Sequence, residues 1–235
     1  MKDLARAIFP EGGQNCVNEF LLNVITRLDD EMNALKVKLD KAKSPTLELE
    51  FCRNISARTK TSTTCEFCIK ESNVDEDLFI IPLEIPEGTA TLAECLLFSF
   101  DGDHIPEKDS MECDFCEQTV MRRRKHRLLS QPETLLFQVK RVKWNRERVN
   151  LAKDSTPINA EEILSVSLIS DSNSAADYEL VGVICHDGNA EKGHYFSYIK
   201  SENKWTKADD DRATVTTREE VLGATNGVTF MYRRL

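Results

Sequence analysis

The sequence predicts an α+β fold in which one long helix precedes a chain dominated by β-strands. Residues 15–42 carry apolar side chains at helical spacing, whereas 178–185, 194–200, 203–208 and 227–233 have the short, apolar-rich pattern of strands. These four segments predict an antiparallel sheet at the C-terminal end. Two Cys-x-x-C pairs lie between the helix and this sheet, and they predict a β-rich region organised around a metal ion.

Composition and charge set the broad class. The 235 residues are 40% hydrophobic and 30% charged, which suits one domain spanning 1–235 with a real core. The longest apolar runs are too short to cross a membrane, and the N-terminus lacks the apolar core of a signal peptide. We therefore expect no membrane partner and an intracellular location, in cytoplasm or nucleus, with reduced cysteines. A net charge of −9 argues against nucleic acid as the main partner; it permits a basic protein partner and is equally compatible with solubility alone.

The predicted helix at 15–42 is amphipathic. Asn15 is suited to be its N-cap, and lysines near its end complement the helix C-terminus ahead of Pro45. Its apolar stripe consists of Val17, Phe20, Leu21, Val24, Ile25, Leu28, Met32 and Leu35.

The middle of the chain alternates strand and helix signals. Leu47, Leu49 and Phe51 open a predicted strand within 46–60, and 77–85 reads as a second strand that ends at a Pro-Glu-Gly turn. Residues 91–100 predict a short helix with four inward side chains, Leu92, Cys95, Leu96 and Phe100. The basic run 121–126 is typical of a solvated strand face rather than of a nucleic-acid site in so acidic a chain.

Residues 133–144 predict a strong strand. Leu135, Phe137, Val139 and Val142 supply its expected buried side. The following residues, 145–176, are polar apart from one short apolar piece.

The cysteine pairs Cys65/Cys68 and Cys113/Cys116 form two knuckles. Each tight turn can point two sulfurs at one ion, and four thiolates favour zinc in a closed, structural site. A strand and a helix are expected between the two halves. Disulfides, which are disfavoured inside cells, and a redox-active pair, which would occur singly, are the alternatives.

The other four cysteines have different expected roles. Cys95 and Cys52 are expected to be core residues, with a small chance of a metal role for Cys52. Cys185 and His186 are neighbours in a strand, so their side chains should point to opposite faces and not form a catalytic pair. Cys16 stands at the start of the long helix, where the helix field favours a thiolate.

Histidine and aspartate near the C-terminus have the arrangement of a general base and its orienting group. His194 opens a strand, and Asp209 and Asp210 end the next one. We expect a carboxylate to accept the Nδ1 proton, which leaves Nε2 free to take a proton from a thiol. A purely structural strand histidine is the alternative. Gly193 and the small Ser197 favour a site that another backbone approaches closely.

The order of these segments resembles the ubiquitin-specific protease family, the large cysteine deubiquitinase class. Residues 13–21 resemble the family's Gly-Gln-Gln-Asp-Ala-His-Glu-Phe-Leu helix start, and the knuckles resemble its zinc-ribbon fingers. Residues 132–142 resemble its Pro-x-x-Leu-x-x-x-Leu-Lys-Arg-Phe strand. The run 186–210 resembles its histidine box, and 228–233 its closing strand.

The resemblance implies a papain-like cysteine protease core. Residues 1–60 would be a helical remnant of thumb and palm, 61–130 the zinc-ribbon fingers, and 131–235 the palm with the histidine box. It also implies His194 as the general base, Asp209 as its orienter and Asp210 as the neighbouring polar position. The implied partner is ubiquitin or a ubiquitinated protein, and the implied reaction is thiol-dependent cleavage of ubiquitin from proteins.

The nucleophile departs from the family pattern. The family's cysteine box, of the type Gly-Asn-Thr-Cys-Tyr-Met-Asn, is expected well upstream of the helix, but only about a dozen residues precede it here. The thumb is therefore expected to be largely missing and the chain weakly active or inactive. In a rival alignment 15–18 is a shortened cysteine box with Cys16 as nucleophile. A pseudo-deubiquitinase that binds ubiquitin or a scaffold partner is the main alternative, and an unrelated zinc-ribbon interaction domain is a third.

Overall fold

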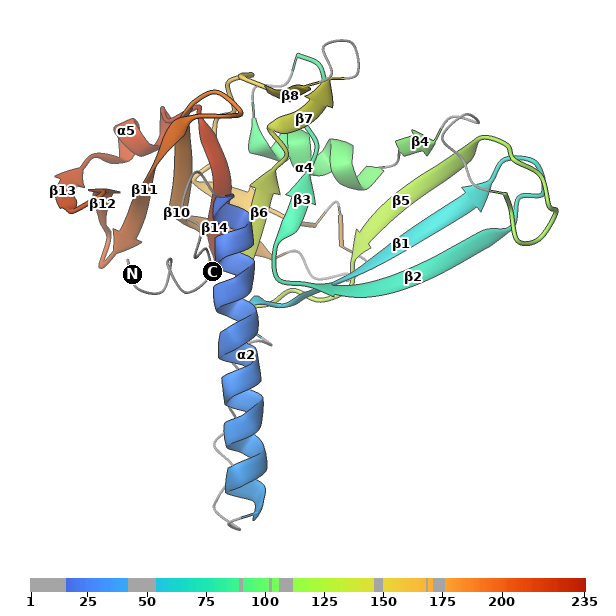
Figure 1. Cartoon of the computed structure of the whole chain (residues 1–235), viewed down its shortest axis with the longest axis horizontal. Helices are drawn as coiled ribbons and strands as arrows, with labels where there is room; N and C mark the ends of the chain where they lie inside the picture. Colours follow the sequence, from blue (N-terminus) through green and yellow to red (C-terminus); the bar gives the residue numbers. More distant parts are fainter. Residues whose placement is uncertain are drawn as a thin grey trace.

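The structure, a computed structural model, describes residues 16–41, 54–88, 91–101, 103–105, 112–145, 150–167, 169–170 and 176–235. A large sheet occupies one side, a four-stranded sheet extends away from it, and helix α2 (Val17–Lys41) projects in a third direction (Figure 1). None of the helices within these ranges has the length and apolar character that crossing a membrane requires.

The large sheet contains the four strands predicted at the C-terminal end. Its order is β13-β12-β11-β10-β14-β6-β3, with β9 paired to β10, and its pairs are antiparallel except β3 with β6. Its strands are β3 (Ile81–Leu83), β6 (Thr134–Val139), β9 (Ile163–Ser165), β10 (Asp177–Gly188), β11 (Gly193–Ser201), β12 (Lys204–Asp209), β13 (Arg212–Thr216) and β14 (Gly227–Arg234). The edge strand β13 and helix α5 (Arg218–Leu222) were not expected from the sequence, because their residues are mostly exposed and polar.

The core lies against this sheet. Phe137, Tyr178, Phe230 and Tyr232 are fully buried, and each such side chain contributes about 1.5–3 kcal/mol by leaving water. The buried phenols keep partners, since Tyr178 donates to the Pro132 carbonyl and Tyr232 to the Glu161 carbonyl, both at 2.7 Å.

Helix α4 (Leu92–Asp101) confirms the predicted short helix, and its buried residues include all four expected inward side chains.

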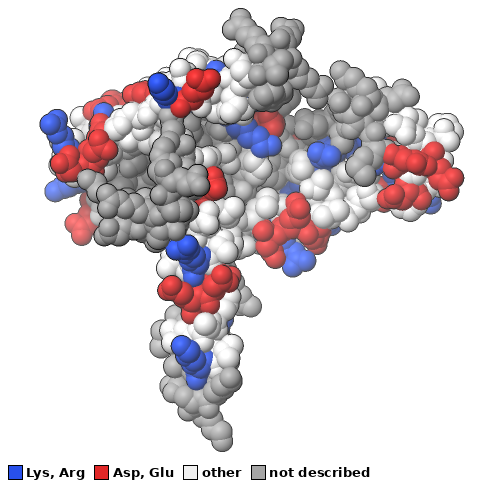
Figure 2. Space-filling model, viewed as in Figure 1, with Lys and Arg blue, Asp and Glu red and all other residues white. Residues whose placement is uncertain are grey.

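The four-stranded sheet, in contrast, is polar. Its order is β2-β1-β5-β4, made by β1 (Ala57–Cys65), β2 (Glu71–Leu78), β4 (Asp103–Ile105) and β5 (Arg122–Leu128). Seven of the eight residues of β2 are exposed, and the basic run predicted at 121–126 becomes β5. Charged side chains of both signs gather on this sheet and along α2 (Figure 2).

Two predicted strands are each broken in the structure. The strand expected at 77–85 is wrong as one unit: β2 ends at Leu78 and pairs with β1, whereas β3 begins at Ile81 and pairs with β6 of the large sheet. The chain bends at residues 79–80 because it passes from one sheet to the other. Tertiary pairing therefore divides a segment that looks continuous in its apolar pattern.

The strand expected at 133–144 breaks at Arg141. There β6 gives way to a hairpin of β7 (Val142–Asn145) and β8 (Asn150–Lys153). Val142 is 47% exposed rather than buried, because the neighbouring Arg141, at 3% exposure, takes the interior position. Its guanidinium donates to the carbonyls of four residues, Asp154, Thr156, Thr225 and Gly227.

Helix α2 confirms the predicted long helix, with a stripe that is less buried than its pattern suggests. Ile25 is buried, but Leu28 and Leu35 are 40% and 46% exposed, because the later turns lead away from the sheets (Figure 1). Its first turn is tied to the large sheet by a 2.6 Å hydrogen bond from Thr229 to the Asn18 side chain. The predictions for Asn15, Cys52 and the strand start at residues 47–51 lie outside the described residues.

Candidate functional site

The four knuckle cysteines come together at the far end of the four-stranded sheet. Cys65 Sγ lies 3.9 Å from Cys116 Sγ, and Cys68 Sγ lies 3.8 Å from Cys113 Sγ. All four sulfurs are within 4.8 Å of one another. They are free thiols, so the disulfide alternative is wrong for this cluster. A zinc ion with Zn–S bonds of about 2.3 Å would hold tetrahedral sulfurs about 3.8 Å apart, and the donor set therefore fits zinc.

The two knuckles have the same backbone geometry. The Ile69 amide donates to the Cys65 carbonyl, and the Glu117 amide donates to the Cys113 carbonyl. Ile69 and Glu117, each directly after the second cysteine, have φ of 58° and 55°. As predicted, strands and a helix lie between the two halves in the sequence, namely β2, β3, α4 and β4.

Backbone amides at the knuckles favour thiolates. A hydrogen bond from the Cys68 backbone lowers the pKa of the Cys65 thiol to about 7, and one from the Phe115 backbone lowers the pKa of Cys113. Burial raises the pKa of Cys116 to about 12. A cation at the centre would stabilise all four as thiolates, so the cluster is a possible closed zinc site with no position left for catalysis.

His194 and Asp209 meet where β11 begins and β12 ends. His194 Nε2 lies 2.5 Å from Asp209 Oδ1, and Asp210 completes a group whose polar atoms lie within 4.8 Å of one another. The prediction that Nδ1 would face the carboxylate is wrong, because Nε2 makes this contact. Because Nε2 is the nitrogen that contacts Asp209, Nδ1 is the nitrogen left to accept a proton.

Neighbouring charges shift the pKa values of His194 and Asp209. The hydrogen bond to Asp209 raises the pKa of His194, and the charges of Asp209, Asp210 and Asp187 act in the same direction. The hydrogen bond from His194 lowers the pKa of Asp209, with help from Lys207 and Arg212. The two side chains are 48% and 38% exposed, so water screens their attraction and leaves the histidine accessible to a reacting group.

The hairpin before His194 is closely packed around Gly193. A Cβ on Gly193 would lie 2.1 Å from the Asp187 carbonyl oxygen and 2.2 Å from His186 Nε2. No larger residue fits without a shift, because the paired strand β10 approaches Gly193 closely. Gly188, at the other side of the hairpin, has a φ of +106° that L side chains rarely adopt.

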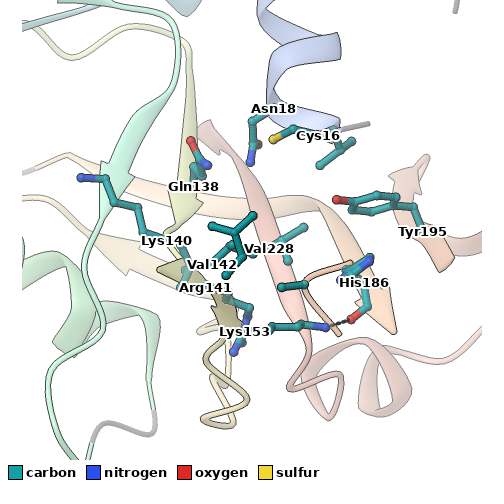
Figure 3. Close-up of a pocket in the computed structure, with 14 residues that line it drawn as sticks. Cys16, Asn18, Gln138, Lys140, Arg141, Val142, Lys153, His186, Tyr195 and Val228 are labelled. Atoms are coloured by element: carbon teal, nitrogen blue, oxygen red, sulfur yellow. Dashed lines mark hydrogen bonds between the residues drawn. The ribbon is translucent and has the colours of Figure 1, made fainter. Parts of the chain in front are cut away.

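A cavity of about 300 Å³ lies beside this hairpin (Figure 3). Cys16 and Asn18 at the start of α2 form one wall, and Tyr195, His186 and Val228 form the opposite one. The remaining lining includes Gln138, Lys140, Arg141, Val142, Leu151 and Lys153.

Cys16 belongs to the Tyr195 side of β11. The Val17 backbone hydrogen-bonds the Tyr195 phenol, and Tyr195 alternates with His194 along the strand. Within the described contacts, the Cys16 sulfur is therefore placed beside Tyr195 rather than beside His194. The predicted separation of the two neighbours on β10 agrees with the structure: Cys185 lies in the core, whereas His186 lines the cavity.

Sequence reasoning missed the polar residues that hold this region together. Lys153 donates to the carbonyls of His186 and Gly188, and the Asn226 side chain donates to Asp187. Backbone carbonyl partners leave no residue-type signature. The one available signal was an arginine within an apolar strand pattern, at Arg141.

The fold is that of the ubiquitin-specific protease catalytic domain. Ubp8, in the structure of the SAGA DUB module bound to monoubiquitin, matches with a TM-score of 0.77 at 20% identity, covering 95% of this chain and 49% of that chain. The sequence pattern of the family described as ubiquitin carboxyl-terminal hydrolase matches residues 1–232. The chain belongs to this family.

Curated relatives carry the same description. Ubiquitin carboxyl-terminal hydrolase 25 of Arabidopsis thaliana is 27% identical over 231 residues, which cover 96% of this chain and 34% of that protein. The probable ubiquitin carboxyl-terminal hydrolase 16 of Schizosaccharomyces pombe is 29% identical over 161 residues, covering 67% of this chain and 34% of that protein. The chain thus spans about a third of the length of these relatives.

Proposed function

We propose that this chain is a deubiquitinase-type domain that binds ubiquitin and supplies the general base for its thiol-dependent release from proteins. The contact between His194 and Asp209 carries the proposal, because it pairs an accessible imidazole with an orienting carboxylate. The cavity between α2 and the large sheet, lined by Tyr195 directly after His194 in the sequence, offers room for an extended peptide segment. Ubp8 in a related fold is described as bound to monoubiquitin, which supports ubiquitin as the ligand.

The chemistry follows from the free nitrogen of His194. With Nε2–H donated to Asp209, Nδ1 accepts the proton of a thiol, and the thiolate attacks the isopeptide carbonyl. The resulting imidazolium is stabilised by Asp209 and returns its proton to the departing lysine amine. A water molecule then gives its proton to Nδ1, attacks the acyl-enzyme and releases the ubiquitin carboxylate and the thiol.

The source of the thiol separates an enzyme from a binding module. Cys16 is the candidate within the described chain, but its neighbour is Tyr195. If Cys16 does not act, this chain alone would bind ubiquitin without cleaving it, which is the pseudo-deubiquitinase alternative. Zinc in the four-thiol site would hold the far end of the four-stranded sheet, and the free thiols of the described cysteines favour a reducing compartment, cytoplasm or nucleus.

Reaction with ubiquitin that carries a C-terminal thiol-reactive warhead tests the proposal. An adduct that disappears in Cys16→Ala identifies Cys16 as the nucleophile. No adduct, together with saturable binding of unmodified ubiquitin, supports the binding-module form. Absence of both adduct and binding contradicts the proposed function.

A further inference from the structure

Lys153, the last residue of β8, reaches the end of a strand in a different sheet. Its ammonium donates to the carbonyl oxygen of His186 at 2.7 Å and to that of Gly188 at 3.0 Å. Figure 3 shows the side chain extended along the cavity floor toward His186. The two carbonyls flank Asp187 near the end of β10, so Lys153 fixes the backbone on both sides of that residue.

The backbone of His194 depends on this same end of β10. In the pairing of β10 with β11, Asp187 lies opposite His194 and Gly188 lies opposite Gly193. The pairing of β11 with β12 begins only at Ser197, opposite Ala208. Among the described strands, His194 is therefore supported by backbone pairing from the β10 side, and its side chain alone reaches Asp209.

Neighbouring contacts show that this end of β10 is held in place from several directions. The His186 amide donates to the Asn226 carbonyl at 3.2 Å, and the Asn226 side chain donates to Asp187 at 2.6 Å. Arg141 holds the residues on either side of Asn226 through their carbonyls, at 2.8 Å each. Lys153 differs from these because it is the charged donor that contacts the hairpin directly.

We propose that Lys153 is a positioning residue for His194, holding the β10 end so that the imidazole meets Asp209. The role of His194 as a base rests on the proposed function, but the positioning itself does not. Lys153 makes no contact with the reacting atoms in this arrangement, and it acts through the backbone of His186 and Gly188.

The proposal is testable through the pKa of His194. A role of Lys153 as a nearby charge and a role as a positioning residue predict different changes in that pKa when the lysine is removed. The titratable groups that face His194 are Asp209 and Asp210 at the end of β12 and Asp187 and His186 on β10. The three carboxylates raise the pKa of His194, whereas burial lowers the pKa of His186, so His186 is uncharged in the pH range where His194 titrates. Loss of a nearby cation alone would leave that pKa unchanged or raise it further. Loss of position would separate the imidazole from Asp209 and Asp187, and the pKa of His194 would fall toward its ordinary value.

The experiment is an NMR pH titration of the His194 ring in the isolated chain, with His194→Gln used to assign the resonance. We expect Lys153→Met to lower the pKa of His194 by about 0.5 unit or more, and Lys153→Arg to restore it, because a guanidinium can donate to both carbonyls. Lys200→Met is the matched control. Lys200 lies on β11, is 12% exposed and donates to Glu179 at 2.5 Å, and its loss should leave the His194 pKa unchanged.

An unchanged or raised pKa in Lys153→Met would overturn the proposal, and so would an equal fall in Lys200→Met. If Lys153→Met does not fold, Lys153→Gln, which keeps one donor group, takes its place. We expect it to lower the pKa of His194 as well. Ubiquitin binding, measured on the same samples, reports on the proposed function separately. Its absence would remove that function and leave the positioning result standing.

Discussion

The two sheets of this chain are stabilised by different physical means. The large sheet packs fully buried aromatic side chains against helix α4 and the loops, whereas β2 of the four-stranded sheet is almost entirely exposed. At the far end of the four-stranded sheet, the buried residues include Cys65 and Cys113 of the thiol cluster. Hydrophobic burial therefore stabilises the large sheet, whereas the four-stranded sheet relies on a thiol site that a bound metal would stabilise.

This difference bears on where the proposed chemistry lies. His194 and Asp209 sit on the sheet whose position is fixed by a core, which is the rigidity that a proposed catalytic pair requires. The four-stranded sheet extends outward with charged faces. The predictions that follow test the two halves of this comparison in turn.

Removal of metal should have the largest effect, and it should be confined to one region. Structural zinc in small thiol sites contributes an apparent stabilisation of about 10–16 kcal/mol. We expect one zinc per chain by elemental analysis, lost in a Cys65→Ser, Cys113→Ser variant. Hydrogen exchange should then rise in β1, β2 and β5 and remain slow in β10 and β14. Unchanged metal content in the variant would refute the zinc assignment. Equal loss of protection in both sheets would refute the claim that the two sheets are stabilised by different means.

Truncation of the core should have the next largest effect. Phe230 is fully buried on the central strand β14, and Phe230→Ala should lower the free energy of unfolding by about 3–5 kcal/mol. Val74 on β2 is 54% exposed, and Val74→Ala should change it by less than about 0.5 kcal/mol. Urea unfolding with the metal site intact checks both. Similar losses in the two variants would contradict the difference in burial.

The buried Arg141 tests what holds the β7–β8 hairpin in place. Arg141→Met leaves four backbone carbonyls without their donor and should cost about 2–3 kcal/mol in the free energy of unfolding. Lys140→Met is the neighbouring control. It loses an exposed ion pair to Glu84, which is worth at most about 1 kcal/mol. A larger loss in the lysine variant would show that the buried network is not what holds this segment.

The smallest predicted effect concerns pH. Because the pKa of His194 is raised in the folded chain, its contribution is fully present below the unfolded value of about 6.5 and is lost as pH rises through the folded pKa. Because the pKa of Asp209 is lowered, its contribution is present above about 3.9 and is lost as pH falls through the folded pKa. Asp209→Asn should remove the Asp209 dependence, weaken the His194 dependence, which Asp210 and Asp187 also support, and lower the His194 pKa in an NMR titration. Identical pH–stability profiles of variant and wild type would show that the contact is not formed in solution.

The sequence was most informative where a side-chain pattern decides structure. Alternating apolar residues located the C-terminal strands, the paired cysteines located the thiol cluster, and the four inward residues of α4 are buried as expected. It was least informative where backbone partners decide. The breaks at residues 79–80 and at Arg141 arise because the chain changes sheets or turns into a hairpin, and neither event changes the local pattern. The ring nitrogen that faces Asp209 and the two carbonyls held by Lys153 likewise depend on three-dimensional position.

The most direct test of the central claim is a titration of the isotope-labelled chain with unmodified monoubiquitin, followed by NMR. The account predicts saturable shifts that include Tyr195, His186 and Val228 around the cavity between α2 and the large sheet. Absence of shifts at saturating ubiquitin, or shifts restricted to residues away from this cavity, would contradict it.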